Sequence, residues 1–330
     1  MTGFRRQAEG VPVSIVNIVH VVRPGLVTTI QDEGRWGYQS SGVPVAGPMD
    51  PLSHRLANAL VGNDRSAATL EATLIGPELQ FEDERVVAVS GAEFDLSLDG
   101  HPVRVGTSFV APAGASLAFG ERRRGARAYV AIEGGIAVPP VLGSRATHLV
   151  TAMGGLGGRA LQAGDDLPLG DRRGTVGARP MRTTAALDAP AGPACLRVLP
   201  GPHHQSFTAG ALELLLSAPY AVSTASDRMG FRLEGPALTD ARKGDIISEA
   251  TTMGALQVPS AGQPILLMAD RQTTGGYPTI ATVITADISV AGQLAPGDRV
   301  MFVACSAREA MEALVALEHT VMAVEAGSRS

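Results

Sequence analysis

ILLMADRQTTGGYPTIATVITADI, residues 265–288, is the most informative segment of this sequence. An apolar run ends at Asp270 and Arg271, a polar segment with two adjacent glycines follows, and a second run rich in β-branched residues begins after Pro278. Short runs of this kind, bounded by Gly and Pro, are typical of strands. The stretch therefore predicts two strands joined by a polar corner.

The polar corner carries side chains suited to binding a small molecule. A guanidinium such as Arg271 can hold a carboxylate or phosphate through two hydrogen bonds, and a carboxylate such as Asp270 can accept from an N–H group. The glycine pair permits positive φ and lets a ligand approach the backbone. The alternative is a hairpin corner whose Asp–Arg pair only satisfies loop backbone, and both interpretations stay open. The other candidate substrate-binding residues of the corner are Gln272, Thr273, Thr274, Gly275, Gly276 and Tyr277.

Two further polar clusters lie upstream of this corner. SDRMGFRLE, residues 226–234, again places an aspartate, Asp227, beside an arginine, Arg228, with a glycine following. The other cluster contains Glu249 and Gln257, the latter between apolar residues. A buried amide needs hydrogen-bond partners, so Gln257 indicates either a ligand or a structural network. Taken alone, each cluster is more often structural than functional.

A similar set of polar residues occurs in the first half, at Gln31, Asp32 and Arg35. Ordinary turn chemistry is the competing interpretation, because Asp-Glu-Gly and Ala-Gly-Pro are common in loops. Trp36 and Tyr38, in the same segment, are expected either to line a pocket or to cover the core.

The rest of the chain predicts a mainly β protein with a few short helices. The 39 glycines and 22 prolines favour many short elements joined by tight turns. The predicted helices are 51–61, with Asp50 as cap and Pro51 in the first turn, 204–215, and 307–317 with Ser306 as cap. The clearest predicted strands are residues 13–22, 85–90, 126–132, 195–199, 264–268, 279–285 and 299–304.

A change in composition divides the chain. Residues 171–194 are rich in Arg, Gly, Pro and Ala and show little apolar periodicity, which is typical of a linker or long surface loop. We therefore expect an amino-terminal domain over 1–175, a linker over 176–194 and a carboxy-terminal domain over 195–330. Both domains end with Gly-Asp before an apolar run, which is weak support for two related barrels.

Composition excludes several classes of function. A net charge of −5 gives no reason to expect nucleic acid, and no apolar run is long enough to span a bilayer. The two cysteines, Cys195 and Cys305, do not form a disulfide framework, and no signal sequence is evident, so we expect a cytoplasmic protein. No Walker-type phosphate loop, biotin-carrier context, Gly-x-Ser-x-Gly elbow or metal site is evident, since adjacent residues such as His203-His204 point in different directions on a helix.

The sequence resembles the biotin-dependent carboxyltransferase family. This family includes allophanate hydrolase subunit 2, the C subunit of 5-oxoprolinase and the antagonist of a histidine-kinase inhibitor. The resemblance covers about residues 21–302, and DRQTTGGYP is its most specific part. The strings that carry it are PGLVTTIQDEGRWGYQSSGVPVAGPMD, LANALVGND with AATLEATLIGP, SDRMGFRLEGP, GALQVP with the stretch quoted above, and QLAPGD.

The resemblance implies two cyclophilin-like β-barrel domains and a role within a multi-subunit enzyme. It implies the C-type component of an ATP-dependent 5-oxoprolinase, which opens 5-oxoproline to glutamate together with a smaller B-type partner and a lactam-hydrolase component of A type. No cofactor is expected to be bound covalently, and ATP is expected at the level of the complex. One alternative is an allophanate hydrolase subunit 2 or urea-carboxylase-like component, with carboxybiotin on a separate carrier. The other is a binding protein that antagonises a histidine-kinase inhibitor.

From residue type and local spacing, we expect the reacting amide or ureido carbonyl near the corner from Asp270 to Tyr277. Arg271 would hold an anionic group, which is the substrate carboxylate, a phosphate or a carboxylated cofactor. Asp227 or Glu249 positions or deprotonates a nitrogen, and the N–H groups of Gly275 and Gly276 are candidate oxyanion donors. Asp270, Arg271, Asp227 and Glu249 are therefore the candidate catalytic residues, and Arg228 and Gln257 join the corner as substrate-binding residues.

Overall fold

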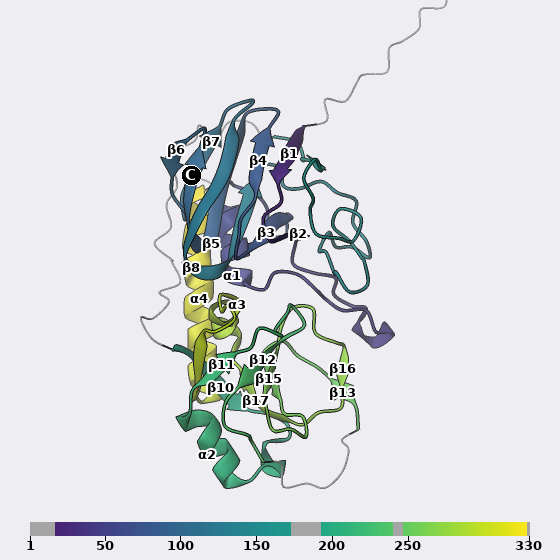
Figure 1. Cartoon of the computed structure of the whole chain (residues 1–330), viewed down its shortest axis with the longest axis vertical. Coiled ribbons are helices and arrows are strands. Elements are labelled where there is room, and N and C mark those ends of the chain that lie inside the picture. The colour runs from purple at the N-terminus through teal and green to yellow at the C-terminus, as the bar shows by residue number, and fades with distance from the viewer. Residues whose placement is uncertain (1–16, 173–192, 240–246, 329–330) are drawn as a thin grey trace, which may run out of the picture.

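The computed structural model describes residues 17–172, 193–239 and 247–328. Two β-sheets make up most of it, one on either side of the segment 173–192 (Figure 1). The prediction of a mainly β protein with few helices is confirmed. Most of the predicted linker 176–194 and the start of the predicted strand 13–22 lie outside the described residues.

The first sheet has nine strands and curls without closing. Its main path runs β2-β3-β8-β4-β1-β9, and β5 pairs with β6, β7 and β8. The long strands β5 and β8 pair through three shifts of register between Gly91 and Leu96, which let the sheet bend. The strands are β1 Ile18–Arg23, β2 Val27–Gln31, β3 Thr69–Thr73, β4 Glu78–Phe81, β5 Arg85–Leu98, β6 His101–Val103, β7 Ser108–Ala111, β8 Ser116–Ile132 and β9 Asp166–Pro168.

The second sheet is a closed barrel of seven strands. Their order is β10-β17-β14-β15-β12-β11-β18, and Leu196, Phe231, Leu256 and Phe302 fill the interior. The strands are β10 Ala194–Pro200, β11 Tyr220–Val222, β12 Gly230–Glu234, β14 Ala255–Gln257, β15 Ile265–Leu267, β17 Thr279–Val283 and β18 Arg299–Ala304. Two short strands, β13 Glu249–Ala250 and β16 Thr274–Gly275, form a separate pair beside the barrel.

Two of the three predicted helices begin where the sequence indicates, and the third does not. Helix α1 (Pro51–Leu60) begins as predicted, because the Asp50 carboxylate accepts from the Ser53 N–H at 2.9 Å. The predicted helix 204–215 is instead a 3₁₀ turn η2, His204–Ser206, followed by α2, Ala209–Ser217, which Thr208 caps. The remaining elements are η1 Gln39–Ser41, η3 Thr285–Asp287, α3 Ile288–Gly292 and α4 Ala307–Ser328.

Helix α4 joins the two halves. It leaves the barrel after β18 and runs along the first half, where it packs on α1 (Figure 1). The Arg55 guanidinium on α1 donates to both carboxylate oxygens of Glu318 at 2.6 and 2.9 Å, and Val321 is fully buried. None of the helices in the described residues is both long and apolar enough to cross a membrane.

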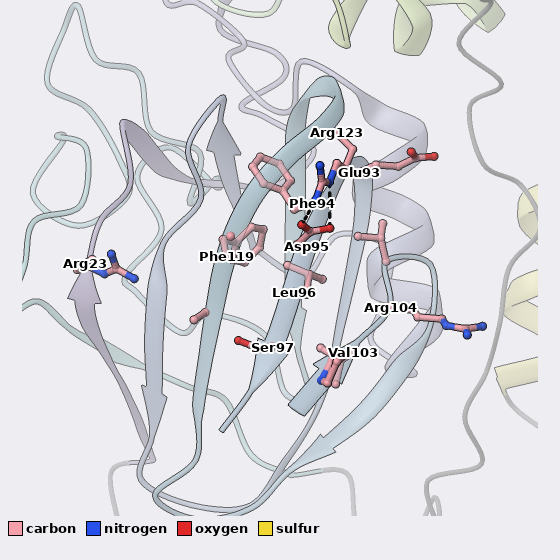
Figure 2. Close-up of a pocket in the computed structure, with 14 residues that line it drawn as sticks. Arg23, Glu93, Phe94, Asp95, Leu96, Ser97, Val103, Arg104, Phe119 and Arg123 are labelled. Carbon is pink, nitrogen blue, oxygen red and sulfur yellow. Dashed lines mark hydrogen bonds and ion pairs between the residues drawn. The ribbon is translucent and has the colours of Figure 1, made fainter. Parts of the chain in front are cut away.

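A hollow of about 890 Å³ lies on the first sheet, between β5, β6 and β8 (Figure 2). Its floor is apolar, with the rings of Phe94 and Phe119 edge to face at 5.2 Å. Charged side chains such as Arg104 and the Asp95–Arg123 ion pair form its rim. None of the residues that the sequence predicts for a site lines this hollow, so the predicted site lies elsewhere.

Candidate active site between the two halves

The two Asp–Arg clusters predicted separately from the sequence meet in one ion pair. Asp270, three residues after β15 ends at Leu267, is 2% exposed, and its carboxylate accepts from Arg228 Nε at 3.0 Å and Nη2 at 3.1 Å. Each partner therefore pairs across 42 positions and not with its sequence neighbour, Arg271 or Asp227. This two-bond geometry is the strongest form of a carboxylate–guanidinium contact.

Arg228 also reaches the first half of the chain. Its Nη1 donates to Glu71 on β3, and its Nη2 donates to the Gly47 carbonyl. The other Glu71 oxygen accepts from the Met49 N–H at 2.9 Å and the Tyr129 hydroxyl at 2.7 Å. Burial raises the pKa of Glu71, but Arg228 and Arg127 outweigh burial and hold it below its ordinary value. The carboxylate is therefore ionised.

Glu71 and Tyr129 are not predicted from the sequence. The signal available for Glu71 is its position in β3, whose residues Thr69–Ala72 are all buried, because an acid there must have a buried partner. Tyr129 carries no such signal, since an aromatic residue in a strand is ordinary core.

Arg271 follows Asp270 but is not paired with it. Its Nε is buried and has no hydrogen-bond partner within the described ranges. Burial lowers the pKa of the Arg271 guanidinium, and the nearby charge of Asp270 partly opposes this effect. A half-buried guanidinium with an unmet donor is well suited to an anionic ligand.

Gln257 and Gln272 form an amide pair behind the corner. Gln257 is 3% exposed, its Oε1 accepts from Gln272 Nε2 at 3.2 Å, and its Nε2 lies 3.5 Å from the Tyr277 carbonyl. The partners that Gln257 requires are thus supplied by residues of the predicted corner.

The pair of strands β13 and β16 places Glu249 opposite Gly275, and Thr274 opposite Ala250. The Thr251 N–H donates to the Thr273 carbonyl at 3.0 Å, which continues this pairing. Glu249 is exposed and its Oε2 lies 3.6 Å from Nε2 of His203, a residue that is not among the predicted site residues. We call β13, β16 and the exposed turn at Gly276 and Tyr277 the flap.

Asp227 lies apart from the flap. It is exposed, and its Oδ1 accepts from the N–H groups of Met229 at 2.8 Å and Gly230 at 3.3 Å, so one of its roles is to close its own turn. With Arg228 and Asp270 it lines a cavity of about 330 Å³ between the two halves.

The lining of this cavity is mostly apolar, and its charged residues include Arg127. The Arg127 guanidinium lies 5.4 Å from the centre of the Phe231 ring and donates to the Gly292 carbonyl at 2.6 Å. The apolar walls come from both halves and include Val27, Leu74, Val150, Val222, Met229 and Leu294.

Gln31, Asp32 and Arg35, the polar set in the first half, are buried. The Asp32 carboxylate accepts from the Ser144 hydroxyl and the Gly34 N–H, at 2.5 and 3.0 Å. Arg35 is 1% exposed, its Nη2 donates to the Ala146 carbonyl, and its Nε and Nη1 find no acceptor in the described part of the chain. Burial lowers the pKa of Arg35, which Asp32 and Asp270 oppose.

The two aromatic residues after Arg35 do not cover the core. Trp36 is 63% exposed and Tyr38 is 39% exposed, and neither lines the two hollows described above. No group of three His, Cys, Asp or Glu side chains within the described ranges is arranged to hold a metal ion.

Comparison with known proteins gives the same family for most of the chain. The model of the carboxyltransferase domain, subdomain A and B, matches residues 41–304. The chain belongs to this carboxyltransferase-domain family. It is 39% identical to the C subunit of 5-oxoprolinase from Escherichia coli over 90% of this chain and 94% of that protein, and 36% identical to the Haemophilus influenzae protein of that name over 86% and 89%.

Longer relatives contain the same fold as a part. The chain is 34% identical to urea amidolyase of Lachancea kluyveri, covering 93% of this chain and 18% of that protein. The structure of Kluyveromyces lactis urea carboxylase superposes with a TM-score of 0.85 at 32% identity, covering 96% of this chain and 30% of that chain. TTHA0988 superposes at 0.79 and 37% identity, and there the chain spans 56% of the longer protein.

Proposed function

We propose that this protein is the C-type component of an ATP-dependent 5-oxoprolinase, which opens the cyclic amide 5-oxoproline to glutamate. Two relatives of nearly the same length are named as the C subunit of 5-oxoprolinase, which supports this proposal over the roles of the longer relatives. The observation that carries it is the corner itself, where a half-buried arginine has an unmet donor beside an exposed flap.

Arg271 is the residue proposed to hold the substrate carboxylate. Four of the five N–H groups of the Arg228 guanidinium donate to Asp270, Glu71 and Gly47, so this side chain is less suited to a ligand than one whose buried donor has no acceptor. Arg271 has such a donor, and its charge is partly desolvated, which strengthens a contact to an anion.

The remaining roles follow from where each group lies. Asp270 is bound to Arg228 through both oxygens, so we assign it to positioning and not to proton transfer. Glu249, exposed on the flap opposite Gly275, is the better placed of the two acids to handle the substrate nitrogen near that glycine, whereas Asp227 faces the cavity. The N–H groups of Gly275 and Gly276 are the proposed donors to the developing oxyanion.

The reaction requires other chains under this proposal. We propose a smaller B-type partner and a lactam-hydrolase component of A type, with ATP bound at the level of the complex and no covalently bound cofactor on this chain. We also propose that the complex works in the cytoplasm. The proposal that other chains are needed is supported by the names of the relatives, which are those of one subunit of 5-oxoprolinase.

The experiment that tests the proposal is ATP-dependent conversion of 5-oxoproline to glutamate by this chain with the products of its neighbouring genes, omitting each component in turn. Glutamate should form only when this chain is present. Arg271→Ala should lower kcat/KM by on the order of 100-fold or more, because a charged hydrogen-bond partner of the substrate is lost. Arg299→Ala, which removes an exposed arginine of β18, is the matched control and should leave the rate unchanged.

An unchanged rate in Arg271→Ala would remove this residue from the site. Absence of glutamate with every component present would exclude 5-oxoprolinase. A urea-carboxylase-like role, with carboxybiotin supplied by a separate carrier, would then be favoured by the urea carboxylase structure that this chain matches along most of its length. Antagonism of a kinase inhibitor would be tested next, as binding without turnover.

A further inference from the structure

Glu71 is the fixed end of a chain of contacts that leads to the corner. It lies on β3 of the first sheet and is 1% exposed. One carboxylate oxygen accepts from Met49 and Tyr129, and the other accepts from Arg228. A buried carboxylate with three donors has one available position.

Arg228 connects the fixed Glu71 carboxylate to Asp270 in the second half of the chain. A guanidinium is rigid and planar, so a contact at Nη1 fixes where Nε and Nη2 lie. Those two nitrogens bind the Asp270 carboxylate at 3.0 and 3.1 Å. The Asp270 N–H also donates to the Arg228 carbonyl at 2.9 Å, so both backbone and side chain of Asp270 are fixed to Arg228.

Asp270 in turn sets the start of the corner. Arg271 is the next residue, and its own N–H donates to the Met268 carbonyl at 3.2 Å. The direction in which the Arg271 side chain leaves the backbone therefore depends on how Asp270 is held.

We propose that Glu71 is a positioning residue for the reaction: it holds Arg228, Arg228 holds Asp270, and Asp270 fixes where Arg271 presents its guanidinium. The inference rests on the proposed function, because that function gives Arg271 its contact with the substrate. A strand of the first sheet thus sets the geometry of a site carried by the second, and Glu71 itself touches no reacting atom.

Three variants separate positioning from folding. Glu71→Gln keeps the shape of the side chain and removes the charge that holds Arg228. Tyr129→Phe removes one donor from Glu71 and the acceptor of the Asp50 N–H, but it keeps the charge that holds Arg228, so it decides the matter if Glu71→Gln does not fold. Phe94→Leu is the control, because it loosens the buried floor of the hollow in Figure 2 without touching this chain of contacts.

The first measurement needs no turnover. Phenylglyoxal labels accessible arginines, and mass spectrometry of the full chain digested without trypsin reports the labelling rate at Arg271 and at exposed Arg299. We expect Glu71→Gln and Tyr129→Phe to raise the rate at Arg271 several-fold and to leave Arg299 unchanged, with Phe94→Leu like wild type. A wild-type rate at Arg271 in a folded Glu71→Gln chain, or an equal rise in Phe94→Leu, would overturn the proposal.

The second measurement uses the reconstituted complex. Glu71→Gln should lower kcat by on the order of 10- to 100-fold with little change in KM, as expected for a misplaced group. In an Arg271→Ala background the same substitution should cost nothing more, whereas a purely structural role predicts the same loss in both backgrounds. If wild type shows no turnover, the proposed function fails, and the labelling rates still decide whether Glu71 positions Arg271.

Discussion

His54 lies on the buried face of α1 and is held in its neutral form. It is 1% exposed, with Nδ1 2.9 Å from the Thr69 hydroxyl and Nε2 3.1 Å from the Arg65 carbonyl. Because a carbonyl only accepts, Nε2 carries the proton and Nδ1 accepts from the hydroxyl. Burial lowers the pKa of His54 to about 4, against a smaller opposing effect of Asp32.

This shift predicts a loss of stability in mild acid. An unfolded histidine titrates near pH 6.5, so between about pH 4 and 6.5 the unfolded chain binds a proton that the folded chain does not. The contribution is complete above pH 6.5 and is lost as the pH falls, by up to about 3 kcal/mol. Urea unfolding across this range should show the decline, and His54→Gln should flatten it.

His20 is the control for that experiment because its shift has the opposite sign. Its partly exposed ring lies 2.6 Å from Asp166, whose hydrogen bond raises the pKa of His20. Its contribution is therefore present below pH 6.5 and is lost as the pH rises through the raised value. His20→Gln should leave the acid decline in place, and an equal slope in wild type and His54→Gln would show that His54 is not its cause.

For single residues, the sequence identifies candidate site residues, but it does not identify which residues they pair with. Asp270 and Arg228 are both selected from their local clusters, but each has a charged sequence neighbour that is an equally good candidate on chemistry alone. The choice depends on β12 pairing with β15, which places Gly230 opposite Leu267 and so brings the residues flanking both strands together. Glu71 is harder still to predict as a site residue, because its partner Arg228 lies 157 positions away in the other half.

At the scale of elements, the flap depends on Gly275, because the amides of Gln257 and Gln272 occupy the space that a side chain there would need. A methyl group on Gly275 would lie 2.6 Å from Gln257 Nε2 and 3.3 Å from Gln272 Nε2. Both atoms end flexible side chains, so Gly275→Ala should displace the amide pair and leave the fold intact. We expect kcat/KM to fall between about 10- and 100-fold with little change in melting temperature.

Gly210→Ala in α2 is the matched control for this substitution, because nothing lies within 4 Å of the added methyl. It should keep full activity and gain up to about 1 kcal/mol from the better helix propensity of alanine. Full activity in Gly275→Ala would show that the amide pair does not support the site.

The sequence predicts where a helix begins when a local capping residue marks the start. It does not predict how long the helices and strands are. Asp50 and Ser306 cap α1 and α4 as the sequence indicates, the latter with Glu309 donating its N–H to the Ser306 hydroxyl at 3.2 Å. The predicted helix 307–317 continues to Ser328 because it packs on α1, which is a tertiary effect. Strand 126–132 is similarly only the end of β8, whose full length depends on pairing with β5.

At the scale of the whole molecule, the two halves are joined by buried polar groups as well as by α4. The side chain of Gln293 makes four bonds across this junction. Its Oε1 accepts from the N–H groups of Ala126 and Arg127 at 3.0 and 3.1 Å, and its Nε2 donates to Asp50 at 2.7 Å and to the Arg127 carbonyl at 2.8 Å. Every hydrogen-bonding position of this amide is therefore used.

Gln293→Ala should destabilise the protein by about 3 kcal/mol or more, because each buried group left without a partner costs about 1–3 kcal/mol. Gln263→Ala is the comparison, since that partly exposed amide bonds only to the backbone of Gly235, at 3.0 and 3.1 Å, and water can replace it. The loss of stability in Gln263→Ala should stay below about 1.5 kcal/mol.

Because both halves share the buried network that includes Asp50 and Arg127, differential scanning calorimetry of wild type should show one transition. Two separate transitions in wild type would mean that the halves fold independently and that a contact between them does not hold the corner in place. Equal losses of stability in the two variants would mean that the four bonds of Gln293 do not join the halves.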